Sequence, residues 1–320
     1  MRNPVAVIRA LILLSMCTAC SDPSLQCEVI HRQELPGVPS ASGTAVTRDH
    51  LYITGDNSPW LFRFSRNYQP VSRISVFRYT TLSKGEIIPK KDKPDFEAME
   101  IIGDKLYLFG SGSQSPERDV MVQVDIGNGN RTKTYTLTRF YQTIRKKHLR
   151  KGAVLNIEGV AAKDNRIFFF LRGQNIILEY PVSALFDYFE NGQEYPGPGI
   201  YKITLPAING IQAGFSGATF VPGQDTMIFT ASVEDTSNAY DDGKILGSFT
   251  GIIPCEKLKN GYTPLCTPLY ENNGANEPLL LKAESVSVLE KLSGRNLKIL
   301  LVTDDDTSGN SELLEALIHW

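Results

Sequence analysis

The sequence predicts an all-β protein with the fold of a five-bladed β-propeller, whose N-terminal strand closes the last blade. Three observations predict this fold. A strand that opens with one polar residue recurs five times along the 320 residues. Further predicted strands follow each recurrence, and the chain is one strand short at its end while it has a spare strand at its start. Four-stranded units repeated around an axis are typical of propeller blades.

The repeat is a polar residue that opens a strand of small apolar residues. It occurs in the segments ASGTAV (41–46), DFEAME (95–100), NIEGVA (156–161), FSGATF (215–220) and AESVSV (283–288). The polar residues are Ser42, Glu97, Glu158, Ser216 and Glu284, at intervals of 55, 61, 58 and 68 residues. In the first three units a more apolar strand begins nine residues later, at Leu51, Leu106 and Ile167. A period of this length indicates one repeated structural unit.

Each of the first four units continues with alternating strands. These are WLFRF and VSRISVF, VMVQVDI and TKTYTLT, NIILEYP and IYKITLP, and KILGSFTGII with a strand near PLCTPLY. PVSALFDYFENG reads as a helical insert in unit three. Solenoid repeats are usually shorter, and helices are too scarce for alternating βα units. The alternative is an irregular β-sandwich whose segments look alike by coincidence.

The last unit lacks one strand, because only ELLEALIHW follows LKILLVTDDD before Trp320. A spare strand, CEVIHRQELPG at 27–37, lies at the other end of the chain. If it supplies the outer strand of unit five, the ring closes without an exposed strand edge. We therefore expect residues 27–320 to form a single propeller domain.

The N-terminal 19 residues have the features of a secretory signal: two arginines, a short apolar run and small residues before Cys20. The run is too short to span a membrane. A cysteine at this place resembles a bacterial lipoprotein signal, in which Cys20 is lipidated and residues 20–26 form a tether. We then expect a cell-envelope protein, held at the outer membrane or the periplasmic face. Cys17 stands where that motif usually has leucine, and cleavage by an ordinary signal peptidase, giving a secreted protein, is the alternative.

Composition restricts the partners. With 42% hydrophobic and 21% charged residues the chain is an ordinary globular protein, and a net charge of −2 gives no electrostatic reason to expect nucleic acid. We expect a monomer that meets a membrane only through its lipid anchor. No P-loop, HExxH, GxSxG or zinc-type cysteine spacing occurs in the sequence. The basic run RKKHLRK (145–151) is expected to be a solvated connector between units two and three.

Cys255 and Cys266 flank a hairpin-like segment, EKLKNGYTPL. Outside the cytoplasm two such cysteines could form a disulfide bridge. The alternative is a pair of free thiols.

The five polar residues should lie in one ring, because the first strand of every propeller blade lines the central channel. Three carboxylates around a narrow channel repel one another, so their pKa values rise or a cation neutralises them. Oxygen ligands without His or Cys indicate a hard divalent ion, and a wide ring completed by water suits Ca²⁺ better than Mg²⁺. We predict an axial calcium site formed by Ser42, Glu97, Glu158, Ser216 and Glu284. The alternative is that the glutamates are protonated or solvated.

Glu100, three positions after Glu97, should point to the other face of its strand. We expect its partners inside or between blades, and we do not assign it to the metal.

The ring resembles that of the calcium-activated nucleotidases of the apyrase family, which are five-bladed propellers with one axial calcium ion. The segment GFSGATFVPGQDTMIFTASVED, followed later by KAESVSV, is similar to that family in amino-acid sequence. The spacing of the polar residues is similar over about residues 40–306. The resemblance implies that the five ring residues are calcium ligands. It does not extend to the phosphate-handling residues: Gly55 to Pro59 replace an Asp-Asp-Arg-Thr-Gly run, Arg172 replaces paired arginines, and Ala98 replaces a tryptophan. The chain also resembles uncharacterised propeller lipoproteins of bacteria.

Polar residues at the ends of the second strands should gather at one mouth of the channel. There we expect a small-molecule or glycan ligand to contact Lys91, Lys93, Ser111 and Asp304. Asp56 or Glu234 would act as general base in a hydrolytic reaction, with Arg172 as a further catalytic residue. The alternative is that these charged loop residues are solvated and contact no ligand.

Two functions remain open at this stage. One is a calcium-dependent hydrolase of phosphorylated or similar esters, which basic groups around the ion would favour. The other is a non-catalytic surface propeller that binds a glycan, peptide or protein, with calcium as a structural axle.

Overall fold

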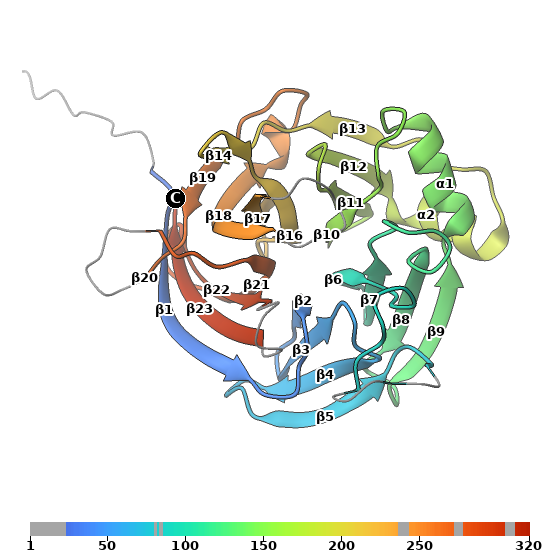
Figure 1. Ribbon diagram of the computed structural model, residues 1–320, viewed down its shortest axis with the longest axis horizontal. Helices are drawn as coiled ribbons and strands as arrows, with labels where there is room; N and C mark the ends of the chain where they lie inside the picture. Colours follow the sequence, from blue (N-terminus) through green and yellow to red (C-terminus); the bar gives the residue numbers. More distant parts are fainter. Residues whose placement is uncertain (1–23, 80–81, 83–85, 236–242, 272–277, 305–310) are drawn as a thin grey trace, which may run out of the picture.

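Five antiparallel sheets surround a central channel in the computed structural model (Figure 1). The structure describes residues 24–79, 82, 86–235, 243–271, 278–304 and 311–320. The predicted all-β, five-bladed propeller is confirmed. The predicted signal segment and Cys20 lie outside the described residues. Within the described part of the chain, no helix has the length and apolar character needed to cross a membrane.

The strands are ordered from the channel outwards in each blade. The inner strands are β2 (Ala41–Val46), β6 (Phe96–Ile102), β10 (Ile157–Lys163), β16 (Gly214–Phe220) and β21 (Ala283–Lys291). The second strands are β3 (His50–Gly55), β7 (Lys105–Gly110), β11 (Arg166–Leu171), β17 (Thr226–Asp235) and β22 (Asn296–Thr303). The third strands are β4 (Trp60–Ser65), β8 (Val120–Asp125), β12 (Ile176–Pro181), β18 (Lys244–Pro254) and β23 (Ser311–His319). The outer strands are β5 (Pro70–Ser75), β9 (Arg131–Thr136), β13 (Gly199–Lys202), β19 (Leu265–Pro268) and β1 (Gln26–Leu35).

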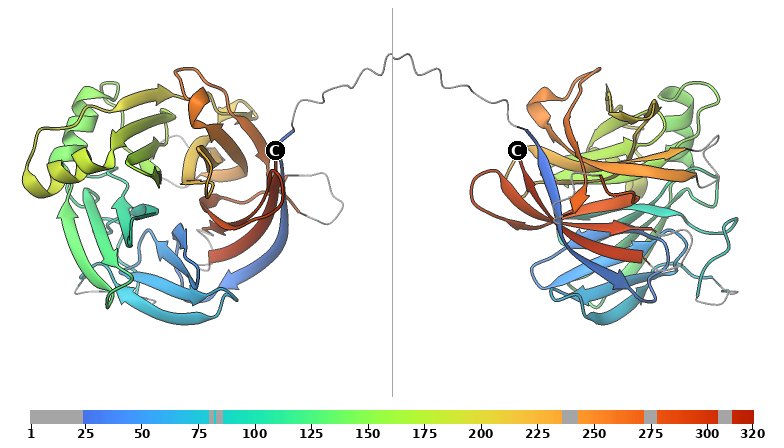
Figure 2. Two further views of the ribbon diagram at one scale, coloured as in Figure 1. Left: turned by 180° about the vertical axis from the view of Figure 1, so that it is seen from behind. Right: turned by 60° about the vertical axis from the view of Figure 1, so that its left-hand side comes forward.

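The N-terminal strand closes the ring, as predicted. β1 runs antiparallel to β23, from Gln26 opposite His319 to Leu35 opposite Ser311. Figures 1 and 2 show β1 along the outer edge of blade 5. A short strand, β20 (Tyr270–Glu271), pairs in parallel with β1 and covers part of the remaining edge.

Five further elements lie outside the blades. They are α1 (Thr138–Lys147), α2 (Val182–Asn191), the hairpin strands β14 (Ala207–Ile208) and β15 (Ile211–Gln212), and a 3-10 turn at Cys255–Lys257. The predicted helical insert in unit three is confirmed by α2, which ends at Gly192 in the left-handed conformation that glycine adopts readily.

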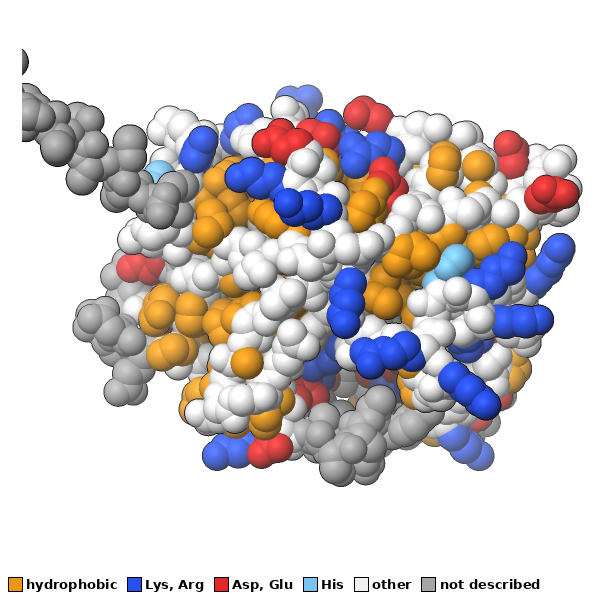
Figure 3. Space-filling model, turned by 90° about the horizontal axis from the view of Figure 1, so that it is seen from above, with side chains coloured by type: hydrophobic (Ala, Val, Ile, Leu, Met, Phe, Trp, Pro, Cys, Tyr) orange, Lys and Arg blue, Asp and Glu red, His pale blue; other side chains and the backbone are white. Residues whose placement is uncertain are grey.

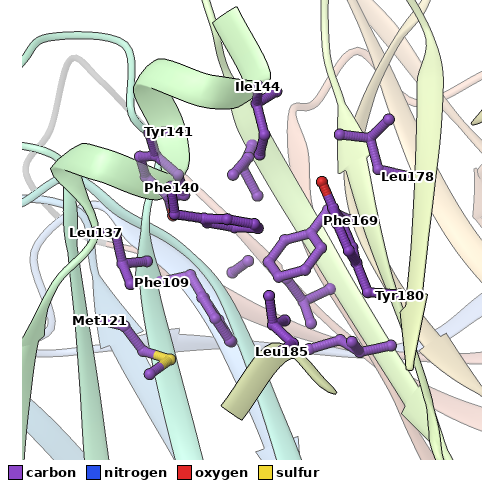
Figure 4. Packing of buried hydrophobic residues seen from close by; sticks show 14 of the residues in the cluster. Phe109, Met121, Leu137, Phe140, Tyr141, Ile144, Phe169, Leu178, Tyr180 and Leu185 are labelled. Atoms are coloured by element: carbon purple, nitrogen blue, oxygen red, sulfur yellow. The ribbon is translucent and has the colours of Figure 1, made fainter. Parts of the chain in front are cut away.

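Neighbouring blades are held together by buried aromatic side chains. Figure 4 shows Phe109 of blade 2, Phe140 of α1 and Phe169 of blade 3 pointing toward one another. The Phe109 and Phe169 rings meet edge to face, with centroids 5.4 Å apart. This geometry is favourable for aromatic pairs, so α1 is part of the core between blades 2 and 3.

Residues 145–151 lie between blades 2 and 3 and are mostly exposed, as predicted, but the first three of them belong to a helix that was not predicted. The run begins inside α1, which buries Phe140, Tyr141 and Ile144 on one face. These apolar residues are spaced by three and four positions, which is typical of a helix, and they stand just before the basic run in the sequence. The exposed cations of α1 belong to a broader group of Lys and Arg side chains on the right of Figure 3, the side that α1 covers.

The predicted bridge between Cys255 and Cys266 is wrong, because both are free thiols. Cys266 on β19 pairs with Gly251 on β18. Cys255 follows β18, four residues after Gly251. Four residues span about 13 Å along a strand, whereas a disulfide needs Cα atoms about 4.4–6.8 Å apart.

A β-bulge occurs at the same place in every inner strand. In β2, Ala41 pairs with Gly55 and Gly43 with Thr54, so Ser42 has no partner in the ladder. The residues skipped in the five inner strands are Ser42, Glu97, Glu158, Ser216 and Glu284. A bulge re-aims the side chain of the extra residue, and these are the five residues of the predicted ring.

Candidate functional site

A cavity of about 830 Å³ lies at one mouth of the channel. In each blade the inner and second strands are antiparallel, so the start of the inner strand lies beside the end of the second strand. Residues from both of these places line the cavity. Asp56, Arg172 and Glu234 line it, in agreement with the predicted position. Of the predicted ligand residues, Lys93 and Asp304 also line the cavity.

Two of the predicted ligand residues are elsewhere. Lys91 is exposed and does not line the cavity. Ser111 is fully buried, and its hydroxyl donates a hydrogen bond to the carboxylate of Asp95. The loop before β6 buries Lys93 and places Lys90 at the cavity as well, while it leaves Lys91 in solvent.

Four of the five ring residues line the cavity, whereas Ser216 is completely buried behind it. The Ser216 hydroxyl donates to the carbonyl oxygen of Ala283, at 2.6 Å. The Ser42 hydroxyl donates in the same way to the carbonyl oxygen of Phe96, at 2.5 Å. Each serine therefore ties its blade to the residue that precedes the glutamate of the next blade. The lone pairs of the Ser42 hydroxyl stay available as acceptors, whereas the Ser216 hydroxyl accepts a hydrogen bond from the Ser232 hydroxyl at 3.2 Å.

A second layer of residues precedes the ring by two positions. Its members, Ser40, Asp95, Asn156, Gly214 and Lys282, all line the cavity. Sequence reasoning missed this layer, although the two-residue period of extended backbone would have identified it.

Blades 3 to 5 carry an alternating row of charges, here called the charge ladder: Glu158, Arg172, Glu234, Lys282 and Glu284. Arg172 lies 3.6 Å from Glu158 and 3.0 Å from Glu234. Lys282 lies 3.1 Å from Glu234 and 2.7 Å from Glu284. Each basic group thus contacts one ring glutamate and the shared Glu234.

A second charge cluster lies between blades 1 and 2. Lys93 contacts Asp56 and lies 2.7 Å from Asp95, which also accepts from Arg118 at 2.7 Å. Among the described residues, Glu97 forms no hydrogen bond or ion pair. Carboxylate oxygens of Asp56, Asp95 and Glu97 lie within 4.8 Å of one another.

The ring carboxyls are held in unusual protonation equilibria. Burial raises the pKa of Glu97 well above its usual range, and the nearby charges of Asp95 and Glu158 raise it further. Burial raises the pKa of Glu284 to about 7, against the opposing charge of Lys282. Burial would also raise the pKa of Glu234, but Arg172 and Lys282 together bring it below its usual value. The ring therefore resists full ionisation unless further positive charge is supplied.

The cavity has more acids than bases. Among the described residues that line it are seven carboxyl groups and five Lys or Arg side chains. Glu284 Oε2 and Asp56 Oδ1 are buried and have no hydrogen-bond partner among the described residues. The donors are carboxylate and hydroxyl oxygens, which hard divalent cations prefer, and one divalent ion would balance the excess charge.

Gly214 leaves room for Arg172. A Cβ atom at Gly214 would lie 2.6 Å from Arg172 Cγ and 3.1 Å from Nε. Blade 4 has no second-layer side chain because the Arg172 side chain from blade 3 occupies that place. The charge ladder thus depends on the absence of a side chain at Gly214, because that absence makes room for Arg172.

We expect Gly214→Ala to displace Arg172 from the ladder and to destabilise the protein by about 1–3 kcal/mol, the usual cost of overpacking. Urea unfolding measures this change. Gly127→Ala is the matched control, because a Cβ at Gly127 meets nothing within 4 Å. Equal stability of the two variants would contradict this role for Gly214.

Glu100 has the partners in neighbouring blades that the sequence predicts. Its carboxylate accepts hydrogen bonds from the backbone N–H of Ile101 at 2.8 Å and of Ala162 at 3.3 Å, and from the Thr219 hydroxyl at 3.4 Å. Ala162 belongs to blade 3 and Thr219 to blade 4, so Glu100 links three blades. Burial raises its pKa to about 8.

Several solved structures of varied activity are similar to this chain. A glutaminyl cyclase of Myxococcus xanthus has a TM-score of 0.52 and 11% identity, with 93% of this chain and 98% of that chain covered. An arabinanase of Bacillus subtilis has a TM-score of 0.44 and 12% identity, covering 87% and 93%. The PQQ-bound aldose sugar dehydrogenase of Streptomyces coelicolor has a TM-score of 0.45 and 12% identity, covering 93% and 100%. At 11% identity the similarity to the glutaminyl cyclase shows the fold alone, and the resemblance to nucleotidases stays a prediction.

No curated protein matches the sequence. The match to a family covers nearly the whole propeller. Residues 37–318 match the model of a family of unknown function (DUF6929), and the chain belongs to that family.

Proposed function

We propose that the protein is a calcium-binding propeller of the cell envelope that holds a small ligand at the mouth of its channel. The observation that carries this proposal is the excess of carboxylates over bases in one cavity, with Glu97 unpaired among the described residues. Asp56, Asp95 and Glu97, whose carboxylate oxygens lie within 4.8 Å of one another, would hold the ion. Glu158, Glu284 and Ser42 line the same cavity and would serve as further oxygen donors. Calcium would supply the positive charge that these buried groups lack.

Binding is favoured over hydrolysis by the state of Glu234, one of the two expected general bases. Asp56 is ion paired with Lys93, and Glu234 with both Arg172 and Lys282. A carboxylate whose pKa is lowered by two cations is a weak general base. The proposed role is therefore that of a ligand-binding propeller.

The envelope location rests on the N-terminal sequence, in which Cys20 follows a short apolar run. Expression of the full chain in bacteria should give a membrane-bound protein that incorporates labelled palmitate. Cys20→Ser should release it into the soluble fraction, and a soluble wild-type protein without label would contradict the anchor.

Calorimetry with CaCl₂ tests the metal site. We expect the wild type to bind one Ca²⁺ per chain. Glu97→Gln should weaken this binding at least about tenfold, which corresponds to about 1.4 kcal/mol. The same variant should unfold at a higher temperature than the wild type without calcium, because the folded wild type must either keep the Glu97 carboxyl protonated or bear a buried charge without a partner.

Glu194→Gln is the matched control, since Glu194 is exposed and outside the cavity. A wild type that binds no Ca²⁺ would contradict the proposed function. So would a Glu97→Gln variant with unchanged calcium affinity.

A further inference from the structure

Arg172 and Lys282 are the resident counter-ions of the ring. Their side chains are only 17% and 13% exposed, and both line the cavity. Each has two carboxylate partners, of which one is a ring glutamate and the other is Glu234. Buried bases of this kind need their partners, because an unpaired buried charge is costly.

A cation bound by the ring would compete for the same carboxylates. Glu158 and Glu284 are proposed ligands of calcium, and they are also the outer partners of the charge ladder. If their charge is taken up by a divalent ion, Glu234 is the one carboxylate left, among the described residues, that contacts both bases. Without the ion, the described residues that line the cavity include more carboxyl groups than bases, and this excess repels an anion. The two charges of the ion remove this excess and leave Arg172 and Lys282 able to donate hydrogen bonds to an oxyanion.

We propose that calcium and an oxyanion bind to this cavity cooperatively, and that Arg172 and Lys282 are the ligands of the anion. This inference rests on the proposed function and names its ligand class: a small molecule that carries a carboxylate or a tetrahedral oxyanion. The guanidinium group of Arg172 can form two parallel hydrogen bonds to either group, and Lys282 adds a point charge beside it. Gly214 keeps the wall next to Arg172 free of a side chain.

Coupling between two ligands is reciprocal, and it is typically worth a factor of about 5–150 in affinity. Calorimetry with the full-length protein therefore measures calcium affinity in sodium sulfate, in sodium acetate and in sodium chloride of equal ionic strength. We expect at least about fivefold tighter calcium binding with sulfate or with acetate than with chloride. Sulfate titrated without calcium should bind more weakly than with calcium, by the same factor.

Lys282→Met separates this role from a structural one. The variant lacks the cation that lies 2.7 Å from Glu284, so calcium should bind more tightly in chloride than it does to the wild type. The effect of sulfate or acetate should disappear at the same time. A merely structural lysine would on removal weaken calcium binding and leave the anion effect unchanged. Lys298→Met is the control, because Lys298 is ion paired with Glu315 and lies outside the cavity.

The outcomes distinguish the two proposals. No calcium binding in any salt would contradict the proposed function. Calcium binding that is equal in sulfate, acetate and chloride would contradict only the coupling, and this result needs no variant to fold. An effect of acetate alone would support the coupling and assign the anion to carboxylates, and an effect of sulfate alone would support it and assign the anion to tetrahedral oxyanions.

Discussion

Deletion of residues 24–35, which include β1, is expected to abolish cooperative folding of the propeller. The strand lies between β23 and β20 and buries Cys27, Val29 and Leu35, each at most 2% exposed. Burial of such side chains is worth about 1.5–3 kcal/mol each. Together with the lost ladder hydrogen bonds this approaches the whole stability of a typical domain, about 5–15 kcal/mol. Thermal unfolding followed by circular dichroism should show no sharp transition.

The deletion also exposes the edge of β23, which can pair with other chains. Gel filtration should therefore show association of the deleted protein. The control is a chain that lacks only residues 1–23 and keeps β1. A peptide of residues 24–37 added to the deleted chain should restore a transition. A monomeric deletion variant with the melting temperature of the control would contradict the closing role of β1.

Glu100 is expected to make the protein less stable as the pH rises. Burial raises its pKa to about 8 in the folded state, whereas the ordinary value is 4.5. Below pH 4.5 the carboxyl is protonated in both states, so it costs nothing. Between pH 4.5 and 8 the unfolded chain loses its proton first, and stability falls by up to about 1.4 kcal/mol per pH unit. Above pH 8 the loss is complete.

Urea unfolding of the wild type and of Glu100→Gln at pH 5, 7 and 9 measures this effect. The full shift corresponds to at most about 5 kcal/mol, and we expect ~2 kcal/mol because Glu100 is partly exposed and solvent screens its charge. The variant should gain stability relative to the wild type from pH 5 to pH 9. Glu290→Gln, an exposed carboxyl on inner strand β21, is the control. A difference between wild type and Glu100→Gln that does not change with pH would contradict this assignment.

The fold was predictable because its signals are local and repeated. Five polar residues in the same phase gave the inner strands, and the spare segment at 27–37 gave the closing strand. The helix α1 was missed because its cations drew the interpretation to charge, while Phe140, Tyr141 and Ile144 carry the helical period. The bridge between Cys255 and Cys266 failed because a short separation in sequence does not fix the register of two strands.

The site was predictable only in part. The ring residues occupy the same position in every repeat unit, so Glu97, Glu158 and Glu284 could be found from the sequence. Lys282 and Asp95 lie two positions before ring residues and were within reach of the same argument. The ion pair of Arg172 with Glu234 joins residues 62 positions apart through side-chain length and direction, which no periodicity describes. Gly214 was beyond prediction, because its contribution is the space it leaves for another blade's side chain.

Because of the bulge in each inner strand, the side chain that faces the channel can change without a change in the strand pairing of the blade. The side chain at each bulge belongs to a residue that the ladder skips, so exchanging it leaves the regular pairing on either side intact. The three glutamates of the ring are thus exchangeable positions on a fixed scaffold, whereas Ser42 and Ser216 also bond to the next blade. Substitution at Glu97 can alter the charge and size of what the channel accepts while the pairing within the blade stays as it is. A propeller built this way can acquire a new specificity by a few changes at one recurring position.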